Sequence, residues 1–480
     1  MSTSLSRRVA VGGLFLAGAQ MVVALGQLTY ASVTSRSIED EVFGAFAVAM
    51  SATGLVALFM TTGLATFALA ADSMSRDNAR AIKSIAWAAG ILTALVVWVG
   101  ADLWVAVWAG TSEAAIMLRL LCVQVLLNAP AAVSVALLRR QARPKADALV
   151  QVVSVIVGLG VGLACIALTG VGVTLVVAPT VTAIVTLVLS SALAHRRYEQ
   201  GESQRIKTVL GFAWRVSNQN LVFFLLMSLP VWAVSRGAGP EELGQFSRAL
   251  VLTQTPALAM TGAIVRAVQP FFRLAEGERR SASVTDAISL SAWVAFPLFF
   301  GLAACARPTV EIVLGRGWDE TAQMVIPLAV GYGLYVVFSV AASAGQTLGA
   351  VRQVTLAQSV MLPICVSLSA LSIYANSSVA AAIAYPAMMG VGIVFMLYGL
   401  GTRGIASFAH GLRSVALHMG AAAVAATVAV AAGRLVGGAS MSSGVILLWS
   451  VLAGFLAWLL MAWALPGGRI LRRRQVFARA

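Results

Sequence analysis

The sequence has little charge. Of its 480 residues, 11% are Asp, Glu, Lys or Arg, whereas 60% are hydrophobic. Soluble domains carry about 25% charged residues. A chain with less than half of that fraction has too few charged side chains to cover the surface of a protein of this size in water. The low charge excludes a soluble enzyme, a disordered chain and a module that binds nucleic acid. A polytopic membrane protein remains.

Cysteine and histidine are also scarce. The four cysteines lie in apolar stretches, no two of them close in sequence, and the three histidines lack the spacing of metal ligands. We therefore expect no disulfide framework, no metal site and no cofactor. These residues are Cys122, Cys165, Cys305 and Cys365, and His195, His410 and His418.

Acidic residues are the rarer of the two charges, with 18 Asp and Glu against 33 Lys and Arg. All of the acidic residues are predicted to lie in loops or at helix ends. A pathway across the membrane would then contain no buried carboxylate. This shortage argues against transport of cationic substrates, which such carboxylates favour.

Long apolar runs are abundant. A helix that spans a bilayer needs about 20 mostly apolar residues. The pattern predicts an all-α polytopic membrane protein with about 14 transmembrane helices. The predicted segments are 9–33, 43–71, 84–108, 114–138, 147–168, 171–194, 208–234, 244–268, 286–306, 321–347, 353–374, 378–400, 415–437 and 443–466. The first is too long for the apolar part of an export signal, so we interpret it as a membrane helix.

Basic loop residues predict the orientation of these helices. One set of alternate loops, together with both termini, holds 24 of the 33 Lys and Arg residues, and the opposite loops hold four. Basic loops stay in the cytoplasm, so both termini are predicted to be cytoplasmic, with the protein in the cell membrane. The excess of Arg (30) over Lys (3) is typical of a GC-rich bacterial genome.

The chain repeats itself at an offset of 200 residues. Residues 35–61 and 235–261 share 11 identities in 27 positions without a gap, including the frame Ser-Arg, Glu, Gly and Phe. The repeat joins helices 1 and 2 to helices 7 and 8, and the even number of helices between them gives both copies the same direction. This predicts two parallel six-helix lobes about an axis along the membrane normal.

The repeat divides the chain into four predicted parts. The N-terminal lobe covers 1–200 and the C-terminal lobe covers 201–405. Helices 13 and 14 cover 406–466, and a basic cytoplasmic tail covers 467–480.

Three corner motifs resemble those of a known family. Arg36 with Gly44 and Phe46 resembles the corner after the first helix of polysaccharide flippases. Residues 239–246 are similar to the corner in their second half, and residues 315–318 resemble their Gly-x-x-Trp corner. The chain thus resembles the Wzx-type oligosaccharide flippases, the polysaccharide transporter branch of the multidrug/oligosaccharidyl-lipid/polysaccharide (MOP) flippase superfamily.

This resemblance implies that helices 1, 2, 7 and 8 line the transport cavity and that helices 13 and 14 offer a surface to a lipid tail. It implies three kinds of partner: a polyprenyl-pyrophosphate-linked oligosaccharide, membrane lipids, and the polymerase or glycosyltransferases of the same pathway.

Five arginines lie inside predicted helices, where a charge is costly and usually faces a cavity. In helix 8, Arg248, Thr255, Ala259, Gly262, Arg266 and Gln269 share one face. The equivalent face of helix 2 is apolar. Arg248 and Arg266 are therefore candidates to bind substrate, although snorkelling to nearby headgroups is the alternative. Snorkelling is favoured for Arg119 and Arg434, near outer helix ends.

Two further groups of polar residues are candidates. Arg215, Asn218 and Gln219 share a face at the start of helix 7, and Gln20 and Gln27 share a face of helix 1. Such groups cannot face lipid without cost. They either bind substrate or form hydrogen bonds between helices.

Guanidinium groups suit phosphate oxygens, and amides suit sugar hydroxyls. The sequence therefore favours a flippase, not an enzyme, that moves polyprenyl-pyrophosphate-linked oligosaccharides to the outer leaflet for surface polysaccharide synthesis. A multidrug or metabolite antiporter of the same superfamily is the alternative. A membrane glycosyltransferase or polymerase is the third hypothesis, with the acidic clusters at 39–41 and 318–320 as its only candidate groups.

Overall fold

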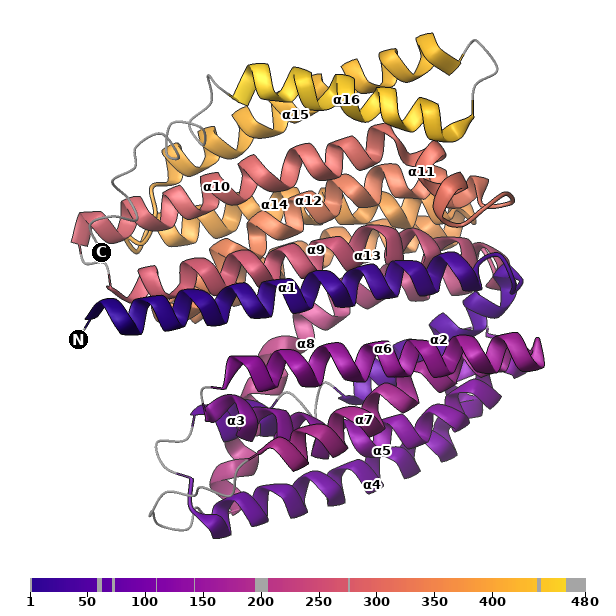
Figure 1. Ribbon diagram of the computed structural model, residues 1–480, viewed down its shortest axis with the longest axis vertical. Coiled ribbons are helices and arrows are strands. Elements are labelled where there is room, and N and C mark those ends of the chain that lie inside the picture. The colour runs from indigo at the N-terminus through magenta and orange to yellow at the C-terminus, as the bar shows by residue number, and fades with distance from the viewer. Residues whose placement is uncertain are drawn as a thin grey trace. The chain divides into compact units, whose positions relative to one another are not determined.

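The computed structural model describes residues 2–57, 63–70, 74–108, 110–141, 143–194, 206–274, 277–437 and 442–462. All regular structure within these ranges is helical (Figure 1). Eleven of the described helices are long and apolar enough to cross a bilayer. The predicted fold class, an all-α polytopic membrane protein, is confirmed.

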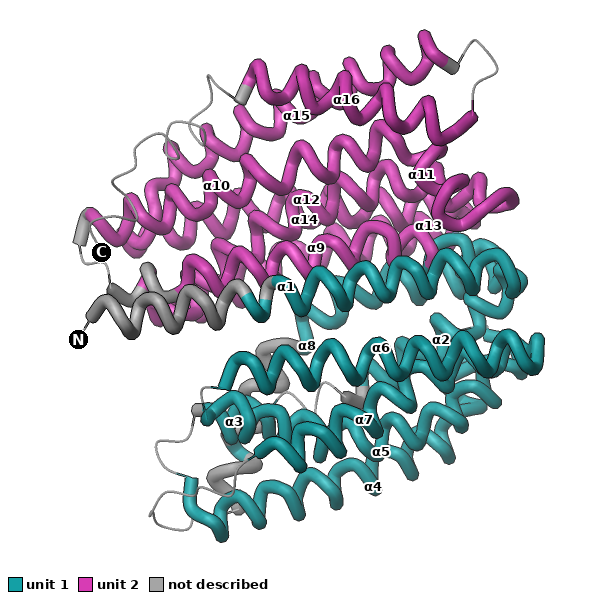
Figure 2. The backbone as a smooth tube through the Cα atoms, in the orientation of Figure 1, with its two compact units in different colours: residues 1–247 teal, residues 248–480 magenta. Residues whose placement is uncertain are grey.

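The chain forms two compact units, residues 1–247 and 248–480 (Figure 2). Their boundary falls inside one continuous helix, α9 (Pro240–Leu274), whose first two turns belong to unit 1. The division into lobes at residue 200, which the repeat suggests, remains a prediction. The predicted tail at 467–480 lies outside the described residues.

Unit 1 is a bundle in which α1 packs on α6, α6 on α7, α7 on α5, and α5 on α2 and α4. Its elements are α1 (Ser2–Thr34), α2 (Asp40–Ala57), α3 (Gly63–Ala70), α4 (Arg76–Val107), α5 (Ser112–Arg140), α6 (Pro144–Thr169), the 3-10 turn η2 (Gly172–Val176), α7 (Val177–Leu193) and α8 (Ile206–Gly237).

Unit 2 is built around α12, most of whose residues are buried. This helix packs on α10 and α14, while α15 packs on α10 and α16. The elements of the unit are α10 (Gly277–Ala304), α11 (Ala306–Val313), α12 (Asp319–Thr347), α13 (Val351–Ala375), α14 (Ser378–Gly401), α15 (Phe408–Gly437) and α16 (Ser443–Ala462).

Each predicted segment coincides with helical structure, but several boundaries were wrong. Helix α4 begins at Arg76, eight residues before the predicted start, where the Ser75 side chain accepts a hydrogen bond from the Asn78 N–H. Hydropathy marks only the apolar part of a helix, whereas the backbone hydrogen bonds continue beyond it. The short α11 was not predicted, and the segment 43–71 contains two helices, α2 and α3.

The two copies of the repeat meet at a reciprocal contact within unit 1. A Cβ added at Gly44 would collide with the carbonyl group of Pro240, and one added at Gly244 would collide with that of Asp40. Both pairs are related by the offset of 200 residues. The glycines in the repeated frame are therefore required by close backbone packing.

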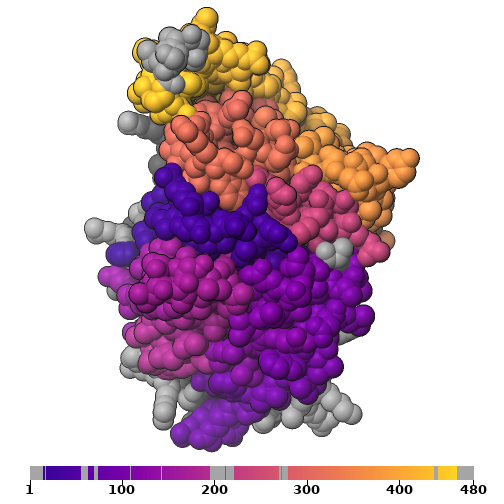
Figure 3. Space-filling model, turned by 90° about the vertical axis from the view of Figure 1, so that its right-hand side faces the viewer, coloured from indigo at the N-terminus to yellow at the C-terminus, as the bar shows by residue number. Residues whose placement is uncertain are grey.

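Three further contacts join this end of unit 1. Trp108 stacks on Trp232 with ring centroids 4.6 Å apart. Ser235 Oγ donates to the Trp108 carbonyl at 2.5 Å, and Gln245 Nε2 donates to Asp40 Oδ2 at 3.0 Å. In the space-filling view of Figure 3, indigo and purple atoms of unit 1 lie side by side. The basic-loop pattern predicts that this end faces outward.

Candidate functional site

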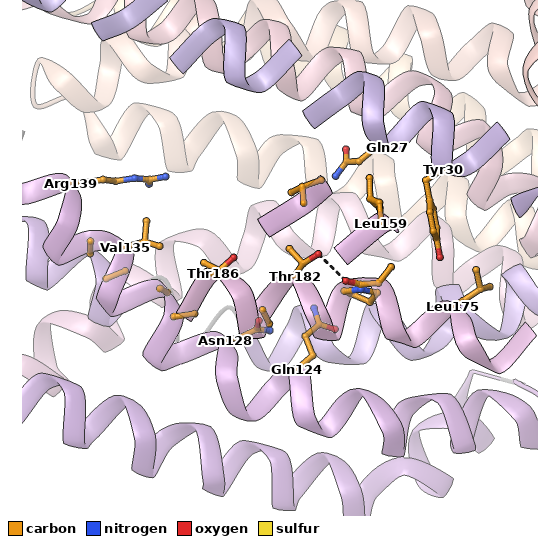
Figure 4. A pocket seen from close by; sticks show the side chains of 18 of the residues that line it. Gln27, Tyr30, Gln124, Asn128, Val135, Arg139, Leu159, Leu175, Thr182 and Thr186 are labelled. Carbon is orange, nitrogen blue, oxygen red and sulfur yellow. Dashed lines mark hydrogen bonds between the residues drawn. The ribbon is translucent and has the colours of Figure 1, made fainter. Parts of the chain in front are cut away.

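A cavity of about 560 Å³ lies within unit 1. It is lined by residues of α1, α2, α3, α5, α6, η2 and α7, so helices from distant parts of the chain form its walls (Figure 4). The volume falls in the range of small-molecule sites, roughly 300–1,000 Å³.

Polar side chains project into this cavity from three helices. Gln124 and Asn128 lie one turn apart on α5, Thr182 and Thr186 one turn apart on α7, and Gln27 faces them from α1 (Figure 4). Spacings of four residues place each pair on one helix face. The rest of the lining is mostly apolar, and Arg139 is the only charged side chain among the described lining residues.

Close packing of α6 on α7 shapes one wall of the cavity. A Cβ at Gly158 would collide with Thr182 Oγ1, and one at Gly162 would lie 2.8 Å from the Ala178 Cβ. Thr182 Oγ1 donates to the Ala178 carbonyl at 2.8 Å. These glycines let the two helices approach as small residues do in membrane bundles. On this wall α7 presents threonine, alanine and proline side chains, and α6 contributes Val155 and Leu159.

An ion pair lies at one end of the cavity. Arg139 Nε donates to Asp147 Oδ2 at 3.0 Å, with the Asp147 side chain 8% exposed and the Arg139 side chain 47% exposed. Asp147 lies at a helix end, as the sequence analysis predicts for the acidic residues, and its burial is the feature that the sequence did not indicate. Asp147 is in the first turn of α6, but helix packing covers it, and the arginine compensates its charge.

The two candidates on α1 have different surroundings. Gln27 lines the cavity, and its contact with a substrate stays a prediction. Gln20 Nε2 donates to Gln151 Oε1 of α6 at 2.6 Å. Gln20 thus forms a hydrogen bond between two helices, which the sequence analysis gives as the alternative to substrate binding. Its role in binding substrate stays a prediction.

The polar face of α9 is buried at two positions and partly exposed at the others. Arg248 is 6% exposed and Ala259 is 7% exposed. The Arg266 guanidinium lies over Gly262, one turn back on the same helix, and Gln269 Nε2 donates to Thr347 Oγ1 at 3.3 Å. Burial of Arg248 fits a role inside the protein better than snorkelling. Contact with a substrate remains a prediction.

The other candidates are described only in part. The side chains of Arg215, Asn218 and Gln219 on α8 lie outside the described residues. Arg119 Nη2 pairs with Asp102 Oδ2 at 2.6 Å. Arg434 is exposed in the last turn of α15. The exposure of Arg434 near a helix end is consistent with snorkelling, whereas the half-buried Arg119 is paired with a carboxylate of the protein.

The sequence analysis missed several residues of the cavity. Gln124 and Asn128 carried a usable signal, because two amides four residues apart occur inside an apolar segment. Arg139 was counted only as a basic loop residue that sets orientation. The pairing of Arg139 with Asp147 depends on the packing of α5 against α6, which sequence spacing does not predict.

The family of polysaccharide biosynthesis proteins matches residues 33–323, more than half of the chain. The chain belongs to this family. Among curated proteins, it is similar to the succinoglycan biosynthesis transport protein ExoT of Rhizobium meliloti (strain 1021), with 26% identity over 311 residues. That match spans 63% of this chain and 62% of the relative's length.

Solved structures agree on the fold of this polysaccharide biosynthesis protein. The lipid II flippase MurJ in an inward closed conformation superposes with a TM-score of 0.73 at 12% identity, covering 97% of this chain and 99% of that one. An inward-facing multidrug resistance MATE family transporter of the MOP superfamily gives 0.60 at 15% identity, covering 82% and 98%. At these identities, the likeness shows that this chain shares its fold with both structures.

Proposed function

We propose that this protein is a flippase for polyprenyl-pyrophosphate-linked oligosaccharides in the cell membrane, with both termini cytoplasmic. It accepts the headgroup at the cytoplasmic leaflet and releases it at the outer leaflet for surface polysaccharide synthesis. It works by alternating access through a cationic central cavity. The polymerase or glycosyltransferases of the pathway act before and after it.

The observation that carries this proposal is the chemistry of the polar groups in a chain of the polysaccharide biosynthesis family. The cavity of unit 1 offers amides and hydroxyls with a single arginine, and its described lining contains no Asp or Glu. Outside this cavity, the buried Arg248 of α9 supplies a guanidinium for the phosphate groups. Guanidinium forks bind phosphate oxygens in pairs, and amides bind sugar hydroxyls.

The membrane potential favours the proposed direction. A diphosphate is anionic, and an inside-negative potential assists its outward movement by about 2.3 kcal/mol per charge per 100 mV. Asp147, a buried carboxylate of unit 1, is paired with Arg139 at one end of the cavity. We therefore expect transport without a strict proton or sodium requirement. Loss of transport when an ion gradient is removed at constant membrane potential would contradict this expectation.

The test is mass spectrometry of polyprenyl-linked intermediates in a strain that lacks the gene, together with an assay of surface polysaccharide. The expected result is accumulation of a lipid-linked oligosaccharide and loss of the surface polymer, with both reversed by the wild-type gene. Unchanged lipid intermediates would contradict the proposal.

A multidrug antiporter is the second candidate, supported by the fold shared with the MATE transporter. Cation transporters use carboxylates to bind positive charge, and the described cavity lining has none. Tight binding of tetraphenylphosphonium to the purified protein, unchanged in Arg248→Ala, would favour this second function.

A further inference from the structure

The cavity of unit 1 is elongated along α5. Gln124 and Asn128 lie in the middle of α5, and Arg139 lies at the end of that helix, 15 residues beyond Gln124. At a rise of about 1.5 Å per residue, this separation corresponds to roughly 22 Å. With a volume of about 560 Å³, the cavity is therefore long and narrow.

One buried hydrogen-bond acceptor in the cavity has no donor among the described residues. Gln124 Oε1 accepts no hydrogen bond from the described residues, although it is shielded from solvent. A buried acceptor without a partner is costly, and its presence in a cavity indicates that a ligand or water donates to it. The amides of Asn128 and Gln27 line the same space and supply both donors and acceptors.

The charge of the cavity restricts which ligand fits. A cationic ligand would need a carboxylate, and the described lining has none. A pyrophosphate would need several free cations, whereas Arg139, the only charged residue among the described lining, already binds Asp147. A neutral ligand with many hydroxyl groups matches the amides and threonines through its edges, while its C–H faces match the alanine, valine and leucine side chains.

We propose that this cavity is the binding site for the neutral sugar residues of the transported molecule, extended along α5 as a short linear chain. Gln27, Gln124, Asn128 and Thr186 bind the sugar hydroxyls. The pyrophosphate binds elsewhere, at the arginine-bearing helices. This inference rests on the proposed function and adds that unit 1 selects the glycan separately from its phosphate.

Saturation-transfer NMR on the purified full-length protein tests the inference with two probes. One is the free oligosaccharide released by mild acid from the lipid-linked pool of the gene-deletion strain, and the other is inorganic pyrophosphate. Gln124→Leu and Asn128→Leu should each weaken binding of the oligosaccharide about fivefold, the value of one net hydrogen bond. Binding of pyrophosphate should not change.

One control variant and one further test variant complete the experiment. Gln323→Leu removes an exposed amide from α12, outside the cavity, and should bind the oligosaccharide as the wild type does. Thr186→Val is nearly isosteric, so it should weaken binding of the oligosaccharide without loss of folding if the leucine variants prove unstable.

The outcomes separate this inference from the proposed function. Binding of the oligosaccharide that is unaffected by Gln124→Leu, Asn128→Leu and Thr186→Val would overturn the inference. So would binding of pyrophosphate alone by the wild type. If the deletion strain accumulates no lipid-linked oligosaccharide, the proposed function fails, and the inference that rests on it falls as well.

Discussion

The two copies of the repeat share a backbone contact and differ in the chemistry that follows it. Gly44 and Gly244 pack against the carbonyl groups of Pro240 and Asp40 in the same way. One turn later, the first copy has Val48, which is 3% exposed, where the second has Arg248, which is 6% exposed. The two copies share the geometry of the corner, while the helix face beyond it carries a charge at Arg248 and not at the equivalent Val48.

The reciprocal glycines provide the test with the largest expected effect. Gly44→Val and Gly244→Val would each drive a side chain into a backbone carbonyl group, which cannot move aside as a side chain can. Overpacking costs about 1–3 kcal/mol even where side chains can adjust, so we expect at least that loss of stability here. Yield and monodispersity after size-exclusion chromatography measure it.

Gly100→Ala is the matched control, since no atom lies within 4 Å of a Cβ added at this helical glycine. It should behave as the wild type. A large effect at only one of the two repeat glycines would show that the contact is not equivalent in the two copies.

Arg248→Ala tests the difference between the copies. It gives the second copy an apolar side chain where the first has Val48. Hydrogen bonds from a charged group contribute about 1.5–3 kcal/mol each, so transport should fall at least tenfold while expression and folding are kept. The measurement is surface polysaccharide restored in the deletion strain.

Arg434→Ala, at an exposed site, should leave transport intact and serves as the control. Wild-type transport by Arg248→Ala would remove α9 from the pathway.

The ion pair of Arg139 and Asp147 extends the comparison to a charge within unit 1. Arg139→Ala would leave the Asp147 carboxylate buried without its partner. Breaking a fully buried pair costs about 3–5 kcal/mol, and we expect less here because the Arg139 side chain is 47% exposed. Thermal unfolding of the purified protein should show a lower midpoint for Arg139→Ala.

Adding Asp147→Asn to that variant should recover most of the loss, because the amide carries no charge to bury. A double variant no more stable than Arg139→Ala would mean that the arginine acts through other contacts.

The Ser-Arg pair of the repeat gives the smallest expected effect. Arg236 Nη1 donates to the Val107 carbonyl at 2.5 Å in an exposed position. Net contributions of hydrogen bonds at exposed sites are small, so Arg236→Ala should cost less than about 1 kcal/mol. Ser235→Ala, which loses the partly buried bond to Trp108, should cost more. Equal unfolding midpoints for the two variants would contradict this order.

The bilayer explains why the helices could be predicted from the sequence. It demands runs of about 20 apolar residues, and these runs are readable without knowledge of packing. Helix ends were less predictable, as at Arg76 and Gly277, because polar turns extend helices beyond the apolar core. The eight residues of α11 were too few to produce a signal.

The candidate site was predicted less well than the fold. Gln27 was identified from its place on a shared face, and Gln124 with Asn128 could have been found by the same reasoning. The burial of Asp147 and its bond to Arg139 could not, since they depend on how α6 lies against its neighbours. The reciprocal glycines were recognised as a repeated frame, but their contact is a property of the folded chain.

The reciprocal contact also imposes an order of events during biosynthesis. Gly44 packs against Pro240, and Asp40 against Gly244, so the start of α2 cannot complete its packing until about 200 further residues have been made. At roughly 5–20 residues per second, translation needs about 10–40 s for that length. During that interval, the start of α2 is present in the nascent protein, but the start of α9, against which it packs, has not been synthesised. The insertion machinery, or the bilayer itself, must shield the start of α2 until its counterpart arrives.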